Sequence, residues 1–202
     1  MWWIRSSPPE TSSAGGRDTG QTRVMSVGSL LIITGPPGAG KSTVARLLAE
    51  SLDRSVLVEG DAFFTFLTSG AIPPWLPESN AQNGVVTDAA ARATAAFVDG
   101  GYDTIYDGIM GPWFLPQFMR TAGLTELDYA VILPSVDVLV ERVATRQGHG
   151  FTDEAATRSM HAQFVAHALD EPHAVRLADA NAAAVAAVVA ARRTAGELRI
   201  SA

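Results

Sequence analysis

The segment Gly35–Thr43 reads GPPGAGKST and places glycines, a lysine and two hydroxyl groups in the pattern G-x-x-x-x-G-K-[ST]. Lys41 is the only lysine among the fifteen Lys and Arg residues of the chain. In this pattern glycines let backbone N–H groups converge on phosphate oxygens, and the lysine reaches between the β- and γ-phosphates of a nucleotide. A compact ammonium on a narrow stem suits that position better than the broad planar fork of arginine.

The elements expected on either side of this segment favour a phosphate-binding loop. Residues 29–34 (SLLIIT) read as a buried strand, and residues 42–52 place apolar side chains on one helical face. The alternative is a Gly-Pro turn before a helix that happens to contain a lysine. We expect ATP and Mg²⁺ as cofactors, with Ser42 as a magnesium ligand through its hydroxyl group. The residues expected to bind the nucleotide are Gly35, Gly38, Ala39, Gly40, Lys41, Ser42 and Thr43.

A pair of carboxylates follows the second expected strand. Residues 55–59 continue into the sequence EGD, which places Glu59 and Asp61 at the C-terminal edge of the sheet, where ligands of open α/β folds bind. Asp61 is our candidate base, because a carboxylate there can take the proton of a substrate hydroxyl group and align it for attack on the γ-phosphorus. The competing interpretation is that Asp61 only caps the helix that follows.

Asp107 ends the third expected strand, residues 104–107. An acidic residue after an apolar strand resembles a Walker B aspartate, which would hold Mg²⁺ through water. Two alternatives stay open: Asp107 contacts the substrate, or it only pairs with a nearby backbone turn.

Two arginines lie four residues apart in the segment ERVATRQGHGF. Arg142 and Arg146 therefore share one helical face, and the glycines at 148 and 150 follow directly. The pattern predicts a lid around residues 146–153 that closes over the triphosphate, with both arginines neutralising charge in the transition state. An ordinary solvated helix face is the alternative.

Strand patterns alternate with helical patterns from residue 29 onward, which predicts right-handed crossovers and a parallel sheet covered on both faces. The fold class is therefore α/β: a P-loop NTPase three-layer fold with a roughly five-stranded parallel sheet flanked by helices. The expected strands are 29–34, 55–59, 104–107, 129–133 and 174–177. The expected helices are 42–52, 87–98, 135–147, one capped by Thr152, and 180–194, while residues 70–84 read as an irregular exposed loop.

Composition excludes several kinds of site and partner for this chain. The chain has 202 residues, a net charge of −6 and no cysteine. This excludes disulfides and thiolate metal sites, and it gives no basic footprint for nucleic acid. No apolar run reaches the length that a membrane span needs. We expect a cytoplasmic protein with a disordered leader at 1–28, a single domain at 29–202, a small-molecule partner, and neither nucleic acid nor membrane as partners; the oligomeric state is left open.

The motifs resemble those of the gluconate kinase, shikimate kinase and chloramphenicol phosphotransferase group of small P-loop kinases. The resemblance spans roughly residues 30–177 and is carried by GPPGAGKST, by EGD at 59–61 and by ERVATRQGH at 141–149. It implies ATP, magnesium and phosphorylation of a hydroxyl group on a small metabolite. By this resemblance, Asp61 stands where the group places its substrate-activating carboxylate, and Arg142 and Arg146 stand where it places lid arginines.

The middle of the chain departs from gluconate kinases, because aromatic residues stand where a polyol site would want polar groups. We expect Phe64 and Trp113 to contact the substrate together with Asp61. The predicted function is ATP-dependent phosphoryl transfer to a hydroxyl group of a small molecule, either a sugar acid or a hydrophobic natural product. A nucleotide-dependent switch or binding module is the alternative. The aromatic residues concerned are Phe63, Phe64, Phe66, Trp75, Trp113 and Phe114.

Overall fold

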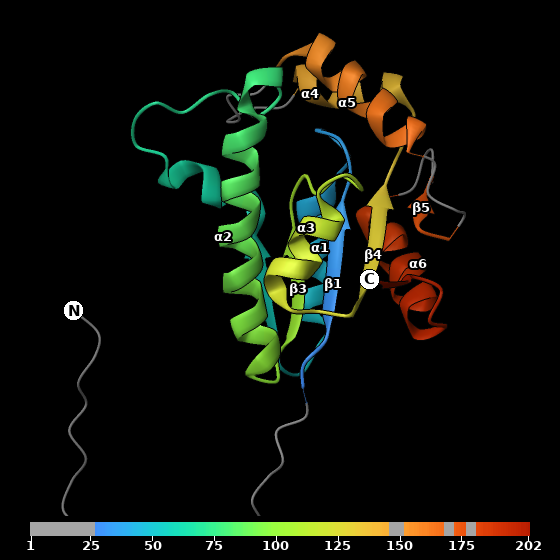
Figure 1. The fold of residues 1–202 in the computed structure, drawn as a ribbon. Helices are drawn as coiled ribbons and strands as arrows, with labels where there is room; N and C mark the ends of the chain where they lie inside the picture. Colours follow the sequence, from blue (N-terminus) through green and yellow to red (C-terminus); the bar gives the residue numbers. More distant parts are fainter. Residues whose placement is uncertain (1–26, 146–151, 168–171, 177–180) are drawn as a thin grey trace, which may run out of the picture.

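Five parallel strands form the centre of the protein, and helices cover both faces of the sheet (Figure 1). The computed structural model describes residues 27–145, 152–167, 172–176 and 181–202. The parallel strands are β1 (Leu30–Thr34), β2 (Ser55–Glu59), β3 (Asp103–Asp107), β4 (Glu126–Ile132) and β5 (Ala174–Val175). The helices are α1 (Lys41–Glu50), α2 (Asn80–Asp99), α3 (Leu115–Ala122), α4 (Val136–Thr145), α5 (Glu154–Ala166) and α6 (Ala182–Thr194), with the 3-10 helices η1 (Gly60–Phe66) and η2 (Pro77–Ser79). The predicted three-layer α/β fold is confirmed.

The strand order β2-β3-β1-β4-β5 places β1 in the middle of the sheet. The loop after β1 therefore starts at the centre of the C-terminal edge, between the ends of β3 and β4. Register brings Asp107 of β3 beside both Ile33 of β1 and Glu59 of β2. The strand order thus gathers side chains from three separate stretches of sequence at one edge.

A sixth strand that the sequence analysis did not predict lies at one margin of the sheet. This strand, β6 (Arg199–Ser201), runs antiparallel to the first half of β4, while β5 pairs with the second half. The sheet is therefore parallel in its five predicted strands and antiparallel at β6. A strand of only three residues is too short to show an alternating pattern, so the sequence does not predict it.

Alternate residues of each strand belong to two separate hydrophobic cores, as the period of two in a β-strand requires. Leu30 and Ile32 face the core that includes α2 and α3, whereas Leu31 and Ile33 face the core that includes α1 and α6. All five residues of β1 are buried. This burial on both faces explains why the strand reads as an unbroken apolar run.

Asp128 of β4 joins β6 and α6 to the sheet. Its carboxylate accepts hydrogen bonds from Arg193 Nε at 3.1 Å and from Arg199 Nε at 3.2 Å. The Asp128 side chain is only 5% exposed, so both arginines compensate a charge that has lost most of its water. This cluster lies at the start of β4, at the sheet edge opposite the phosphate-binding loop.

The segment predicted as an irregular loop, 70–84, is shorter than expected, because α2 already begins at Asn80. The remaining loop is attached to α2 by side-chain amides: Gln82 bonds both the N–H and the C=O of Ile72 at 2.8 and 2.7 Å, and Asn83 Nδ2 donates to the Pro74 carbonyl at 2.7 Å. Proline and asparagine favoured a loop in the sequence pattern, whereas in the structure Gln82 and Asn83 belong to α2 and hold the loop through their side-chain amides.

Three further local differences separate the structure from the expected elements. The aromatic stretch after β2 folds as η1, and α3 lies in a segment for which no helix was expected. The helix predicted to be capped by Thr152 is capped by Asp153, whose side chain accepts a hydrogen bond from the N–H of Ala156 at 2.9 Å. Both residue types are good caps, so the sequence alone did not separate adjacent candidates.

The folded region includes Gly28, whose N–H donates to the carbonyl of Val98 at 2.8 Å. Most of the predicted leader, residues 1–26, lies outside the described residues, as does most of the predicted lid, residues 146–151. Within the described ranges, no helix combines the length and hydrophobicity needed to cross a membrane.

Candidate active site

The predicted phosphate-binding loop bends tightly between β1 and α1. Gly35, Gly38 and Gly40 all have positive φ, at 143°, 79° and 88°, a region that side chains with a Cβ rarely adopt. A Cβ at Gly35 would lie 2.2 Å from the Ile132 carbonyl oxygen, so that position also lacks the space for a side chain. Gly40 is the left-handed N-cap of α1, whose first N–H groups point out of the helix end.

Lys41 is buried although it is charged, with 8% of the residue exposed. Its ammonium donates to the Pro36 carbonyl at 3.2 Å, so the side chain folds back over the loop that precedes it. The neighbouring Ser42 and Thr43 are exposed. This arrangement leaves both hydroxyl groups accessible at the mouth of the loop while the ammonium is held above the backbone.

Asp107 lies within reach of the first turn of α1. Burial raises the pKa of this carboxyl group, whereas a hydrogen bond from Ser42 and the positive charge of Lys41 lower it, and the charges of Asp61 and Glu59 raise it. Its Oδ1 is buried without a hydrogen-bond partner among the described residues. A buried carboxylate oxygen without a partner, next to a serine hydroxyl group, fits an oxygen-liganded Mg²⁺.

Asp61 lies in the first turn of η1, at the C-terminal edge of β2. The N-cap of η1 is Glu59, and no side-chain capping bond is formed there. The carboxylate of Asp61 is exposed and instead faces the N–H of Ile109, in the loop after β3, at 3.5 Å. The alternative in which Asp61 serves only as a helix cap therefore has no support in this geometry.

The 3-10 geometry of η1 sorts its side chains into faces. Residues three apart eclipse one another in such a helix, so Asp61 and Phe64 share one face and Phe63 and Phe66 share another. The rings of Phe63 and Phe66 do meet, with centroids 5.6 Å apart. Phe63 also packs against the hydrophobic core, while Phe64 is half-buried beside the Asp61 face.

Positioning residues around these groups were missed by the sequence analysis. A Cβ at Gly60 would lie 2.2 Å from the hydroxyl oxygen of Tyr106, so the glycine of EGD allows β3 and η1 to approach. Thr34, at the end of β1, accepts the N–H of Met110 at 2.8 Å, and Tyr129 donates to the Met110 carbonyl at 2.6 Å. A polar residue that ends an otherwise apolar strand is the signal that could have pointed to Thr34.

Tyr106 itself stays protonated. Burial raises the pKa of its hydroxyl group, and the nearby charges of Asp61 and Asp107 raise it further. A neutral phenol at this position is a structural contact for Gly60 and not a candidate base.

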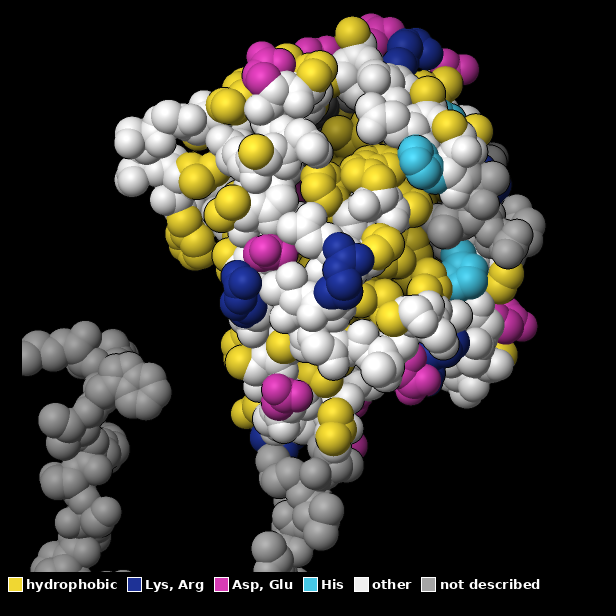
Figure 2. All heavy atoms as spheres, viewed as in Figure 1, with side chains coloured by type: hydrophobic (Ala, Val, Ile, Leu, Met, Phe, Trp, Pro, Cys, Tyr) yellow, Lys and Arg dark blue, Asp and Glu magenta, His cyan; other side chains and the backbone are white. Residues whose placement is uncertain are grey.

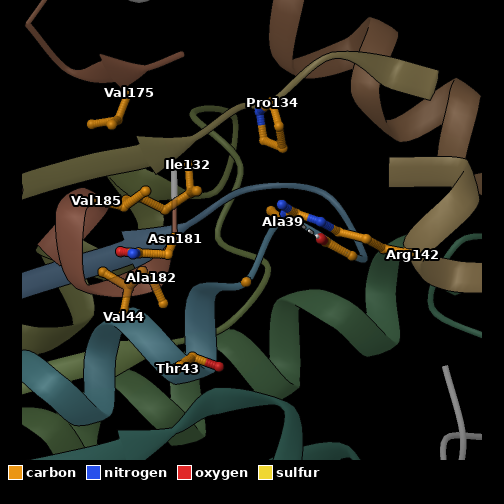
Figure 3. Close-up of a pocket in the computed structure, with 12 residues that line it drawn as sticks. Ala39, Thr43, Val44, Ile132, Pro134, Arg142, Val175, Asn181, Ala182 and Val185 are labelled. Carbon is orange, nitrogen blue, oxygen red and sulfur yellow. Dashed lines mark hydrogen bonds between the residues drawn. The ribbon is translucent and has the colours of Figure 1, made fainter. Parts of the chain in front are cut away.

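Arg142 extends from α4 to the phosphate-binding loop, where Nη1 donates to the Gly38 carbonyl at 3.5 Å (Figure 3). It borders a cavity of about 250 Å³ between the loop, the end of β4 and the start of α6. Arg146 and the lid predicted from it lie outside the described residues, apart from Thr152 and Asp153. The cavity is lined by Gly38, Ala39, Gly40, Thr43, Val44, Ile132, Pro134, Arg142, Val175, Asn181, Ala182 and Val185.

Trp113, expected to contact the substrate, connects the loop after β3 to α5. Its ring lies 5.5 Å from that of Phe164 and 5.1 Å from that of His167, measured between centroids. Phe164 is buried and Trp113 is half-buried, so part of the indole remains accessible. The structure therefore gives Trp113 a packing contact, and its contact with a substrate stays a prediction.

The fold and the loop define a P-loop protein: a glycine-rich loop follows the central strand, a lysine and a serine begin the following helix, and an aspartate ends the adjacent strand. The family model AAA_33, described as "AAA domain", matches residues 30–172, so the chain belongs to that family. None of the proteins with curated descriptions matches the sequence.

Three solved structures share the fold of this chain. The tunicamycin resistance protein of Deinococcus radiodurans has 18% identity over 82% of this chain and 95% of its own, with a TM-score of 0.63. A gluconokinase from Sinorhizobium meliloti has 20% identity over 85% and 95%, with a TM-score of 0.58. The shikimate kinase of Acinetobacter baumannii has 18% identity over 85% and 96%, with a TM-score of 0.58. The expected kinship with small P-loop kinases is confirmed for the fold.

Proposed function

We propose that this protein transfers the γ-phosphoryl group of ATP to a hydroxyl group of a small molecule. The observation that carries the proposal is the meeting of three sequence segments at one sheet edge. Lys41 and Ser42 begin α1, Asp107 ends the adjacent strand β3, and Asp61 lies in the first turn of η1 beyond β2. Phosphoryl transfer needs phosphate binding, a metal ligand and an acceptor base in this arrangement.

In this proposal the two substrates bind on opposite sides of the phosphate-binding loop. Asp61 lies on the β2 and β3 side of the phosphate-binding loop, whereas the cavity bordered by Arg142 lies on the β4 and β5 side. The lining contributed by Ile132, Val175 and Val185 is apolar and suits a flat nucleobase. A triphosphate that runs through the loop would then have its nucleoside in this cavity and its γ-phosphate directed toward Asp61.

The transfer step follows from this placement. The acceptor hydroxyl oxygen attacks the γ-phosphorus, the bond from that phosphorus to the β–γ bridging oxygen breaks, and ADP leaves with the bond electrons. The hydroxyl proton passes to Asp61, which is exposed and therefore open to an acceptor. Lys41 stabilises charge on the phosphates from its buried position, and Arg142 lies beside the loop to do the same from α4.

Two oxygen-bearing side chains at the start of α1 and the end of β3 fit a magnesium site. Ser42 and the partnerless Oδ1 of Asp107 would hold it directly or through water, as oxygen donors do for this ion. When bound, the ion neutralises charge on the β- and γ-phosphates during transfer. Among the described residues no group of three or more His, Cys, Asp or Glu forms a metal cluster, so the site would be completed by phosphate and water.

The test measures ADP release and phosphorylated product with Mg-ATP over a panel of hydroxylated acceptors. Asp61→Asn should abolish acceptor-stimulated turnover while ATP still binds, because it removes the base and leaves the loop intact. Lys41→Arg should lower turnover at least about 100-fold although the charge is kept, since the guanidinium has the wrong shape. Asp53→Asn, in the exposed turn between α1 and β2, is the matched control and should behave as wild type.

Wild-type-like turnover of Asp61→Asn would contradict the proposal. Slow ATP hydrolysis that no acceptor stimulates, in the wild type as in Asp61→Asn, would instead favour a nucleotide-dependent switch.

A further inference from the structure

The segments that carry the carboxylates of the acceptor side supply no lysine or arginine of their own. Residues 55–91 contain no lysine or arginine, and neither do residues 93–119. These ranges include β2, η1, the loop pinned to α2, and the loop that follows β3. They contribute Glu59, Asp61 and Asp107 to the sheet edge, so the fixed charge on this side is negative.

The arginines closest in sequence to these segments are held elsewhere. Arg54 stacks over the ring of Tyr102, 4.0 Å from its centroid, and donates to the Gly100 carbonyl at the far edge of the sheet. Arg92 is paired with Asp88 at 4.0 Å, one turn away on the same helix. Arg120, which follows the second range, lies in the last turn of α3 and acts on Asp88 as well. These three arginines therefore have partners other than Asp61.

Apolar side chains lie near Asp61 both on η1 and in the loop after β3. Phe64 lies one 3-10 turn further along the Asp61 face of η1. Ile109, whose N–H faces the Asp61 carboxylate, is half-buried and leads to Trp113 four residues later. Trp113 packs on Phe164 of α5, which extends this surface to the opposite wall.

A hollow in this part of the protein is lined by hydrophobic side chains (Figure 2). It opens between the N-terminal half of α2, helix α3 and the pair α4 and α5, on the side where the C-terminal ends of the strands lie (Figures 1 and 2). Four half-buried hydrophobic residues pack against the core that includes α2 and α3, namely Phe63, Ile109, Trp113 and Met160. Apolar lining with few polar groups is typical of sites that bind a ring face by contact area.

We propose that the acceptor is a hydroxylated molecule that has an apolar ring face and no acidic group. This inference rests on the proposed phosphotransferase function and specifies its acceptor. An acidic acceptor would bring a further negative charge to an edge that already carries three carboxylates and receives a triphosphate, and residues 55–91 and 93–119 supply no lysine or arginine to offset it. A ring face gains contact area against Phe64 and the loop after β3, and its hydroxyl group then lies at Asp61.

Four probes test the two properties separately. They are 3-phenyl-1,2-propanediol (ring, neutral), 3-phenyllactate (ring, acidic), glucitol (no ring, neutral) and gluconate (no ring, acidic). The readouts are acceptor-stimulated ADP release and the mass of the phosphorylated product. We expect the phenyl diol to give a kcat/KM at least about 10-fold above each of the other three probes.

Paired variants test which residues form the ring site. Phe64→Ala should raise the KM for the phenyl diol about 10-fold, whereas Phe66→Ala, the same change on the other face of η1, should leave that KM within about 2-fold. Phe64→Tyr keeps the ring if the alanine variant folds poorly, and it should retain the low KM.

Every other result with the four probes would overturn either this inference or the proposed function. Preferential phosphorylation of gluconate or 3-phenyllactate overturns this inference and leaves the phosphotransferase proposal standing. Equal use of glucitol and the phenyl diol overturns the ring requirement. If none of the four probes stimulates turnover, the inference is rejected; if in addition Asp61→Asn hydrolyses ATP as the wild type does, the proposed function is rejected with it.

Discussion

Gly35 packs directly against the backbone of Ile132, so that a Cβ added to Gly35 would lie 2.2 Å from the Ile132 carbonyl oxygen. Gly35 is the first residue after β1 and Ile132 is the last residue of β4, the neighbouring parallel strand. The phosphate-binding loop therefore leaves the sheet through a gap that only a glycine fits.

Gly35→Ala should destabilise the fold by about 3 kcal/mol, because it combines a backbone collision with a φ of 143°. Thermal unfolding of the nucleotide-free protein measures this, with about 2 to 4 °C expected per kcal/mol for a chain of this size. Gly40→Ala is the matched control: its φ is also positive, at 88°, but a Cβ there meets nothing within 4 Å, so about 1 kcal/mol is expected. Equal losses in the two variants would show that backbone conformation alone, and not the contact with Ile132, limits Gly35.

Asp107→Asn should raise the thermal stability of the nucleotide-free protein near neutral pH and weaken the effect of magnesium. Burial raises the pKa of this carboxyl group above its ordinary value of 3.8. The folded protein then binds the proton more tightly than the unfolded chain, so the stability from this group is present below pH 3.8 and is lost as the pH rises through the folded pKa. In EDTA, the Tm of Asp107→Asn relative to wild type should therefore increase between pH 4 and pH 7.5.

The same variant should lose the additional Tm that Mg-ATP gives the wild type over ATP alone, because the amide is a poor ligand for the ion. Asp99→Asn, at the C-terminal end of α2, is the control for both measurements. A Tm difference between Asp107→Asn and wild type that falls with rising pH would contradict this account of Asp107.

Asp128→Ala should cost about 3 kcal/mol, because it removes the buried counter-charge of Arg193 and leaves that arginine only the more distant and more exposed carboxylate of Asp103, at 3.9 Å. Arg199→Ala removes an arginine that is 47% exposed on its side chain, and about 1 kcal/mol is expected. Urea unfolding of both variants gives the comparison. A smaller loss for Asp128→Ala than for Arg199→Ala would mean that the buried carboxylate does not hold α6 and β6 on the sheet.

Gln82→Ala should release the loop before α2, because Gln82 satisfies both backbone groups of Ile72. The loss of two hydrogen bonds, each worth about 1 kcal/mol, should speed hydrogen exchange of the Ile72 amide by about 10-fold or more. Gln163→Ala, on the exposed surface of α5, serves as the control. Unchanged exchange at Ile72 would show that other contacts fix this loop.

Much of the fold could be predicted from local patterns. The five parallel strands follow buried apolar runs, and the phosphate-binding loop follows the first of them, because its glycines and its lysine are required within one short stretch. The end of β2 was predicted to the residue, since Gly60 and Asp61 interrupt the strand pattern there. Helix α3 and strand β6 were missed, because their stability comes from packing against distant parts of the chain and not from a local period.

The candidate site also has features that the sequence predicts and features that only the structure reveals. The sequence by itself determined which residues we propose for the chemistry, namely Lys41, Ser42, Asp61 and Asp107, because phosphate binding and proton transfer demand those types of group after buried strands. Only the tertiary structure decided their relationships: Asp107 beside α1, the faces of η1 that align Phe64 with Asp61, and the stacking of Trp113 on α5. These depend on strand order and on contacts between residues tens of positions apart, which a pattern read along one chain does not contain.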